Sequence, residues 1–236
     1  MFQYGNESQD TKGKQVKEFL NKIIRKGNPR WQFFRSVTPS SRILDLGCGS
    51  GDNGTLLRSI KEDIEVHGVD ILPKNLVPPF YTYRCIDLDK EGLPYPDNYF
   101  DAVVFTHVIE HLQSPFELGK EISRVLKKQG QIYVETPNWT SVLVPSFGFR
   151  RKQHSPFNFY DDPSHVKPWS KHGLFEFLSQ GCNCRTSRIG NTRNWIEVPL
   201  DFLIIPFGLL TGSRPLVVSS IWNLYGWCIY AIGVKE

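Results

Sequence analysis

Ile43-Leu44-Asp45-Leu46-Gly47-Cys48-Gly49-Ser50-Gly51 is the stretch that decides the fold of this 236-residue chain. It begins as a short apolar run with a carboxylate near its end and then breaks into glycines, before helix-compatible residues from 53 to 60. This order predicts a buried strand, a tight turn and a helix. Glycines in such a turn take backbone angles that other residues avoid, and they let a ligand lie against the main chain. The stretch therefore predicts a turn that holds a nucleotide.

The charges beside this turn bear on which nucleotide it holds. Gly49-x-Gly51-x-x-Gly54 also matches the dinucleotide fingerprint. A dinucleotide would place its pyrophosphate between Asp45 and Asp52, where like charges repel. S-adenosylmethionine has no phosphate and brings a sulfonium and an ammonium, which suit a turn edged by carboxylates. The residues therefore favour a methyl donor over NAD, and an NAD-binding oxidoreductase is kept as the alternative.

The turn resembles the first motif of the class I S-adenosylmethionine-dependent methyltransferases, and the next hundred residues resemble the same family in the same order. Residues 93–106 are similar to its proline-punctuated turn and to the Phe-Asp pair that opens its fourth strand. The likeness is to the type 11 and type 23 small-molecule branch, strong over residues 40–140 and looser beyond. It implies an α/β fold: a Rossmann-like three-layer αβα sandwich whose seven-stranded sheet is mostly parallel, with an antiparallel edge strand.

Length and composition predict one globular domain, because 236 residues with 40% hydrophobic and 22% charged side chains suit one sizeable core. We divide it into an N-terminal helical cap (1–39), a cofactor-binding core (40–140), a substrate loop (141–170) and a C-terminal part (171–236) with an apolar helical insertion (198–225). The net charge of +4 is too small to indicate nucleic acid. Five cysteines without paired spacing predict neither a disulfide framework nor a zinc site.

Candidate cofactor residues follow the ends of the predicted strands. Asp70 ends the second strand, 19 positions past Gly51, where a carboxylate can accept hydrogen bonds from both ribose hydroxyls. The resemblance implies adenine contacts at Asp87 and Leu88, and a surface turn is the alternative reading of Asp87. Thr106 ends the fourth strand beside the glycine turn. The expected cofactor-binding residues are Asp45, Gly47, Cys48, Gly49, Gly51, Asp70, Ile71, Asp87, Leu88 and Thr106.

Three histidines are the candidate catalytic residues. His107 and His111 lie four apart, on one face if that segment is helical. They superficially suggest a metal motif, but that motif needs a distant third ligand and a suitable helix, so we expect no metal. Asp162-Pro163-Ser164-His165 resembles the D-P-x-H of one branch of the family. His165 is therefore the leading candidate for a general base, with His111 and His107 behind it and a structural role as the alternative.

Two segments bear on the acceptor and on partners. The aromatic, proline-interrupted stretch from residue 139 to 171 is typical of a substrate loop or lid. The apolar insertion is interrupted by Pro206 and Gly208 and is too short to span a membrane. Four roles remain: it covers a lipid-like substrate, lies on a membrane face, forms a dimer contact or packs in the core. A basic amphipathic helix from residue 14 packs on the sheet edge or over the cofactor, or lies on a membrane surface.

These patterns predict a methyltransferase acting on a small-molecule, glycan or lipid-linked acceptor, at oxygen. The start of the chain has no charged segment followed by an apolar core, so we expect a cytoplasmic location, with peripheral membrane contact and a homodimer left open. A non-catalytic binding module that keeps the cofactor fold is a second alternative.

Overall fold

The computed structural model describes residues 26–144 and 158–236. The predicted basic helix up to residue 25, and residues 145–157 of the predicted substrate loop, lie outside the described residues. The strands are β1 (Arg42–Leu46), β2 (Glu65–Asp70), β3 (Thr82–Cys85), β4 (Phe100–Thr106), β5 (Leu126–Pro137), β6 (Cys184–Asn191) and β7 (Cys228–Lys235). The α-helices are α2 (Pro29–Ser36), α3 (Asp52–Ile60), α4 (Pro115–Val125), α5 (Lys171–Glu176), α6 (Val198–Thr211) and α7 (Arg214–Tyr225).

The strands form one sheet in the order β3-β2-β1-β4-β5-β7-β6. The first five of these pair in parallel, and β7 runs antiparallel to both β5 and β6. The predicted seven-stranded, mostly parallel sheet is confirmed, with the antiparallel strand one position in from the edge strand β6. The chain runs outward from β1 to β3 and then crosses back to β4. The carboxyl ends of β1 and β4 therefore form the switch point at which open α/β sheets bind ligands.

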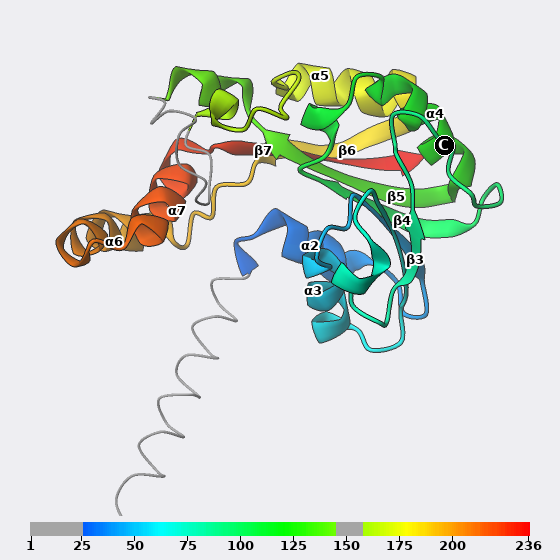
Figure 1. Ribbon diagram of the computed structural model, residues 1–236, viewed down its shortest axis with the longest axis horizontal. Coiled ribbons are helices and arrows are strands. Elements are labelled where there is room, and N and C mark those ends of the chain that lie inside the picture. The colour runs from blue at the N-terminus through cyan, green and yellow to red at the C-terminus, as the bar shows by residue number, and fades with distance from the viewer. Residues whose placement is uncertain (1–25, 145–157) are drawn as a thin grey trace, which may run out of the picture.

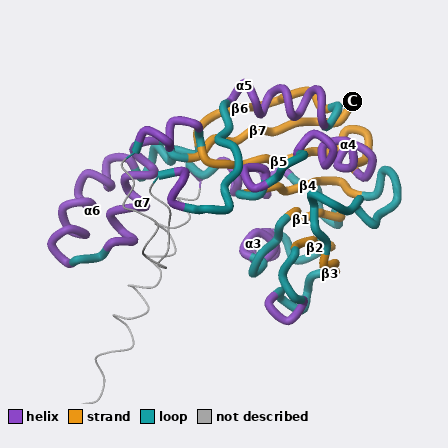
Figure 2. Tube along the Cα trace, turned by 45° about the horizontal axis from the view of Figure 1, so that its top comes forward, coloured by secondary structure: helices purple, strands orange, loops and turns teal. Residues whose placement is uncertain are grey.

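Helices cover both faces of the sheet, with α2 and α3 on one side and α4 and α5 on the other (Figure 1 and Figure 2). Successive side chains of β1 serve the two sides in turn. Ile43 packs with Phe33 of α2 and Leu57 of α3, whereas Leu44 and Leu46 join the core that includes α4. A central strand buried on both faces must be apolar throughout, which is why this one reads as a continuous run.

Local sequence explains where the elements begin and end. Asn28 caps α2, its side chain accepting a hydrogen bond of 3.0 Å from the Trp31 N–H, and Pro29 takes the first helical position. Residues 29–36 lie within the predicted N-terminal cap, where the sequence pattern does not mark them as a separate helix. The helix α4 ends at Val125, because β5 already begins at the next residue. Between β2 and β3 the proline-rich crossover holds one short 3₁₀ helix, Lys74–Leu76, as the prolines predict.

The apolar insertion forms a helical hairpin, α6 packed on α7, which lies beyond the end of the sheet (Figure 1). The turn between the helices begins at Gly212, which has a left-handed φ of 69°. Many large apolar side chains of α6 face solvent, among them Phe202, Leu203, Phe207, Leu209 and Leu210. Core packing therefore does not account for α6. Among the described residues, no helix is both long and apolar enough to cross a membrane.

Two leucines test this division between core and exposed hairpin. Leu57 of α3 is 0% exposed and Leu210 of α6 is 88% exposed. We expect Leu57→Ala to lower the free energy of unfolding by about 3 kcal/mol, because it leaves a cavity between α3 and the sheet. The matched variant Leu210→Ala should change it by less than ~0.5 kcal/mol. Urea unfolding followed by circular dichroism measures both, and equal losses would contradict this packing.

Candidate active site

The turn between β1 and α3 is built on glycines in the left-handed region. Gly47, Gly49 and Gly51 have φ values of 63°, 51° and 87°. A Cβ on Gly47 would lie 2.2 Å from Cγ2 of Val108, and one on Gly51 would lie 2.5 Å from Cδ of Pro78. A Cβ on Gly49 would meet nothing within 4 Å. Gly49 therefore forms an open floor on which a ligand can lie. Gly47 and Gly51 must be glycines because Val108 and Pro78 pack against them.

The carboxylate of Asp70 lies at this open part of the turn. Its Oδ2 accepts a hydrogen bond of 2.8 Å from the Gly49 N–H, and its Oδ1 accepts one of 3.0 Å from the Leu72 N–H. These bonds fix the carboxylate, and each oxygen keeps a lone pair for a further donor. The neighbouring Ile71 side chain is 71% exposed. Two predicted cofactor residues, Gly49 and Asp70, are thus brought together.

The carboxylate of Asp45, by contrast, is fully buried within the wall of the turn. Its Oδ1 accepts a hydrogen bond of 3.0 Å from Asn53 Nδ2, and its Oδ2 accepts one of 2.7 Å from the Tyr81 hydroxyl. Burial raises the pKa of Asp45 to about 6, against the lowering effect of Tyr81, Asn53 and the Arg30 cation. Cys48 is also buried, and burial raises the pKa of its thiol to about 12, so it stays protonated.

The predicted adenine contacts lie in a separate surface loop. The Oδ2 of Asp87 pairs with Lys90 Nζ at 2.7 Å, and its Oδ1 accepts a hydrogen bond of 3.1 Å from the Asp89 N–H. The bond to Lys90 lowers the pKa of Asp87. Leu88 packs against the core on the α4 side of the sheet. The polar contacts of the Asp87 side chain stay within its own loop, so its role toward a cofactor remains a prediction.

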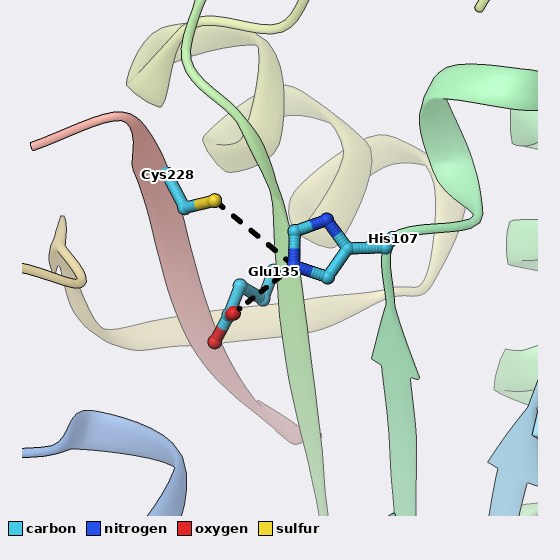
Figure 3. Close-up of side chains that lie close together, drawn as sticks. All are labelled: His107, Glu135 and Cys228. Atoms are coloured by element: carbon cyan, nitrogen blue, oxygen red, sulfur yellow. Dashed lines mark hydrogen bonds and ion pairs between the residues drawn. The ribbon is translucent and has the colours of Figure 1, made fainter. Parts of the chain in front are cut away.

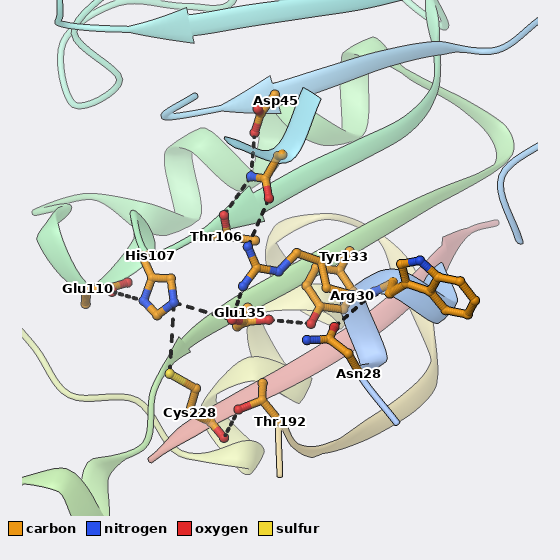
Figure 4. A network of polar contacts seen from close by, with 12 residues as sticks. Asn28, Arg30, Asp45, Thr106, His107, Glu110, Tyr133, Glu135, Thr192 and Cys228 are labelled. Carbon is orange, nitrogen blue, oxygen red and sulfur yellow. Dashed lines mark hydrogen bonds and ion pairs between the residues drawn. The ribbon is translucent and has the colours of Figure 1, made fainter. Parts of the chain in front are cut away.

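A chain of polar contacts runs from the glycine turn across the carboxyl edge of the sheet (Figure 4). Asn53 Nδ2 also donates to Thr106 Oγ1 at 2.8 Å, and its Oδ1 accepts from Arg30 Nη1 at 3.1 Å. Arg30 Nη2 pairs with Glu135 Oε1 at 2.9 Å, and the Tyr133 hydroxyl donates to Oε2 of Glu135. Burial opposes ionisation of Glu135, but the Arg30 cation and these hydrogen bonds lower its pKa to about 2.

His107 continues this chain at the end of β4. Its φ is 55°, in the left-handed region, and its side chain is 42% exposed. Nε2 lies 3.4 Å from Glu135 Oε1 and 4.0 Å from Cys228 Sγ, and Nδ1 lies 3.5 Å from Glu110 Oε1 (Figure 3). Burial disfavours the imidazolium, but Cys228 and the two carboxylates outweigh it and raise the pKa of His107 well above 6.5. In the absence of another ligand, His107 is therefore a proton donor near neutral pH.

The other two predicted histidines lie together, with ring centroids 4.8 Å apart. His165 Nδ1 is 2.5 Å from the Phe159 carbonyl oxygen, and His111 Nδ1 is 3.2 Å from that of Ser164. A carbonyl only accepts, so each ring holds its proton on Nδ1 and leaves Nε2 as an acceptor. The Val166 N–H also donates to the Glu110 carbonyl oxygen at 2.8 Å, which ties this loop to the end of β4.

Several residues of this site were missed by the sequence analysis: Arg30, Asn53, Tyr81, Glu110, Glu135 and Cys228. Glu135 had a signal, because a carboxylate directly follows the apolar run 132–134 near the carboxyl end of a strand. Arg30 and Cys228 had none, since α2 and the start of β7 reach the site only through the tertiary fold.

Comparison with known proteins finds similarity to methyltransferases. Residues 44–134 match a family described as "Methyltransferase domain". The chain is 27% identical over 140 residues to a 2-methyl-6-phytyl-1,4-hydroquinone methyltransferase of Synechocystis sp., covering 57% of this chain and 41% of that protein. It is 33% identical over 103 residues to a malonyl-[acyl-carrier protein] O-methyltransferase of Halorhodospira halophila, covering 40% and 34%. The chain thus spans less than half the length of these two relatives.

A solved structure shares the fold over nearly the whole chain. The crystal structure of a SAM dependent methyltransferase from Archaeoglobus fulgidus superposes with a TM-score of 0.57 at 22% identity, covering 94% of each chain. At this identity the likeness supports the fold, including the β6 and β7 region outside the matched domain.

The buried carboxylate of Asp45 predicts a pH dependence of stability. Its pKa is raised from 3.8 to about 6 in the folded chain, so between these values the folded state holds a proton that the unfolded state has lost. The stability that Asp45 contributes is full below pH ~4 and falls by about 3 kcal/mol as pH rises to ~6. Urea unfolding from pH 3.5 to 7.5 should show this decline in wild type relative to Asp45→Asn, and parallel curves would contradict it.

Proposed function

We propose that the protein transfers a methyl group from S-adenosylmethionine to an oxygen atom of an amphipathic acceptor, because residues 44–134 match a methyltransferase domain and the fold is shared with a SAM dependent methyltransferase. The observation that carries the proposal is the Asp70 carboxylate held by the Gly49 N–H over an open glycine floor. That arrangement suits a ribose, which S-adenosylmethionine and a dinucleotide both carry. The carboxylates of Asp45 and Asp52 around the turn favour the donor that has no phosphate.

In this proposal, residues around the glycine turn each contact a different part of the donor. Asp70 accepts hydrogen bonds from the ribose hydroxyls, and Gly49 lets the donor lie against the main chain. Asp45 supplies negative charge beneath the turn, and Asp87 with Leu88 borders the adenine. When bound, S-adenosylmethionine supplies a methyl group on a sulfonium. The chain's remaining task is to align the acceptor oxygen with that methyl group and to exclude water.

An oxygen nucleophile is assisted by a group that accepts its proton. His165 and His111 fit this role in their neutral forms, because a carbonyl oxygen holds Nδ1–H of each ring and leaves Nε2 to accept a proton. We favour His165, whose ring is fixed against Phe159 at a centroid distance of 4.4 Å. His107 is a poorer base, because the surrounding carboxylates keep it protonated. The proton of the acceptor hydroxyl would pass to Nε2 of His165.

The apolar hairpin of α6 and α7 supports an acceptor with an apolar tail at a membrane face. From Phe202 to Thr211, α6 carries no charged side chain, and its large apolar residues are exposed. At the base of the hairpin, Trp195 is 69% exposed with the Arg193 guanidinium 4.8 Å from its ring. An aromatic ring and a cation beside an apolar helix suit the headgroup level of a bilayer. The phytyl hydroquinone named for one relative is an acceptor of this kind.

Donor binding is measured by calorimetric titration with S-adenosylhomocysteine. We expect Asp70→Asn to raise the dissociation constant 10- to 100-fold, because it removes charge-assisted hydrogen bonds to the ribose. The control Glu117→Gln, exposed on α4, should bind like wild type. NADH bound in place of S-adenosylhomocysteine would refute the methyl donor.

Transfer of a labelled methyl group to hydroquinones or membrane lipid extracts then tests turnover. Donor binding without transfer to any acceptor would favour the non-catalytic binding module.

Membrane contact is tested with two matched double variants. Phe202→Ser with Leu210→Ser alters the hairpin, and Phe175→Ser with Leu76→Ser alters exposed residues of the main body. We expect the hairpin variant to bind phosphatidylcholine–phosphatidylglycerol vesicles at least ~10-fold more weakly, because each buried apolar side chain contributes about 1.5–3 kcal/mol. The body variant should sediment with vesicles like wild type.

Light scattering on the same proteins tests whether a second copy of the chain, instead of a membrane, covers the hairpin. Wild type that forms a dimer, with the hairpin variant monomeric and vesicle binding absent in both, would assign the surface to a second copy of the chain. That result would contradict the membrane proposal.

A further inference from the structure

Three side chains with metal-binding atoms meet at the carboxyl edge of the sheet, each from a different element (Figure 3). His107 follows β4, Glu135 lies in β5 and Cys228 begins β7. We propose that His107 Nε2, Glu135 Oε1 and Cys228 Sγ form a site for one divalent transition-metal ion of the zinc type. The H-x-x-E-H pattern alone gave no reason to expect it, because the other two ligands lie 28 and 121 positions beyond His107.

The distances suit a small ion with four-coordinate geometry. Nε2 lies 3.4 Å from Oε1 and 4.0 Å from Sγ, and the three ligand atoms all lie within 4.8 Å of one another. Zinc bonds of about 2.0–2.3 Å in a tetrahedron separate neighbouring ligand atoms by roughly 3.3–3.6 Å. Small side-chain rotations therefore close the set around an ion. Because the His107 side chain is partly exposed, the ion can enter from solvent and water can occupy the fourth coordination position.

The surroundings of His107 match those of a metal-bound histidine. Glu110 is fully buried, and its Oε1 makes no hydrogen bond among the described residues yet lies 3.5 Å from His107 Nδ1. Its other oxygen accepts from Thr136 Oγ1 at 2.8 Å, which holds the carboxylate in place. A histidine that binds a metal through Nε2 usually donates Nδ1–H to such a carboxylate. An ion at Nε2 would fix that tautomer and satisfy Oε1 of Glu110.

Charge also balances at this site. With the thiol proton released to solvent, Cys228, Glu135 and Glu110 carry three negative charges. A divalent ion and the Arg30 guanidinium, which pairs with Glu135 at 2.9 Å, supply three positive charges. A thiolate together with an imidazole selects zinc-type ions over magnesium or calcium, which prefer oxygen ligands. The Arg30 guanidinium and the ion would both contact Oε1 of Glu135.

A second group of possible ligands, Glu110, His111 and His165, lies nearby. It shares Glu110 with the His107 site and contains no sulfur. The two sites are therefore told apart by whether a thiolate binds the metal. If an acceptor oxygen takes the open fourth position, the ion would lower the pKa of its hydroxyl; this last step rests on the proposed methyltransferase function, whereas metal binding does not.

Cobalt(II) is the probe, because a cobalt–thiolate bond gives an intense near-ultraviolet charge-transfer band. Titration of the full chain should show this band saturating at one ion per chain, and zinc should displace it. We expect Cys228→Ser to abolish the band, and Glu110→Gln to weaken cobalt binding 10- to 100-fold. The matched variants Cys85→Ser and His172→Gln, both at exposed positions, should behave like wild type.

Circular dichroism and binding of S-adenosylhomocysteine check that each variant is folded, and they separate this proposal from the proposed function. Absence of the band in wild type that binds S-adenosylhomocysteine would overturn the metal site and leave the methyltransferase proposal standing. Retention of the band in Cys228→Ser, or its loss in Cys85→Ser, would also overturn the assignment of ligands.

Discussion

The buried carboxylate of Asp45 is the constraint on which the rest of the site depends. A charge or a protonated acid without partners at the end of a central strand would be costly, so the neighbouring elements must supply donors. Asn53 does so from the first turn of α3, and Tyr81 does so from the residue before β3. The Tyr81 hydroxyl also accepts the Gly54 N–H at 2.7 Å, which holds the start of α3. Satisfying one carboxylate thus fixes the geometry of the glycine turn.

Asn53 links this turn to Glu135 and His107 at the carboxyl edge of the sheet. Its amide group contacts Asp45 and Thr106 through nitrogen and Arg30 through oxygen, and Arg30 carries the contacts on to Glu135 and from there to His107. Each member is held by at least one partner from another element, so the edge of the sheet is organised before a ligand arrives. Fixed dipoles and charges of this kind need little rearrangement when a reaction develops charge nearby. Helix α2 therefore takes part in the site, although its sequence resembles a plain packing helix.

The sequence predicted the sheet, and its resemblance to methyltransferases agrees with the domain match over residues 44–134, because both depend on local patterns. The turn at Gly49 needs glycines at fixed spacing, and Asp70 stands at the end of the next strand. Both can therefore be recognised from the sequence alone. Arg30, Glu135 and Cys228 were out of reach because they meet only through pairing of β4, β5 and β7. The end of α4 depends on the tertiary fold for a similar reason: β5 begins at Leu126 to pair with Phe100, and that pairing overrides the helix-compatible Lys127 and Lys128.

The position of the hairpin in the chain connects it to the site. Helix α7 ends at Tyr225 with Gly226 as its C-cap, and Cys228 follows two residues after this cap as the first residue of β7. The Trp222 and Trp227 rings stack at a centroid distance of 4.6 Å, and the Asn138 N–H donates to the Trp227 carbonyl oxygen at 2.7 Å. A membrane surface that bound α6 and α7, as we propose, would therefore act on the segment that presents Cys228 to His107. Since a ligand shifts a conformation only through contacts that differ between states, this short connection is where binding at the hairpin would change the acceptor side of the site.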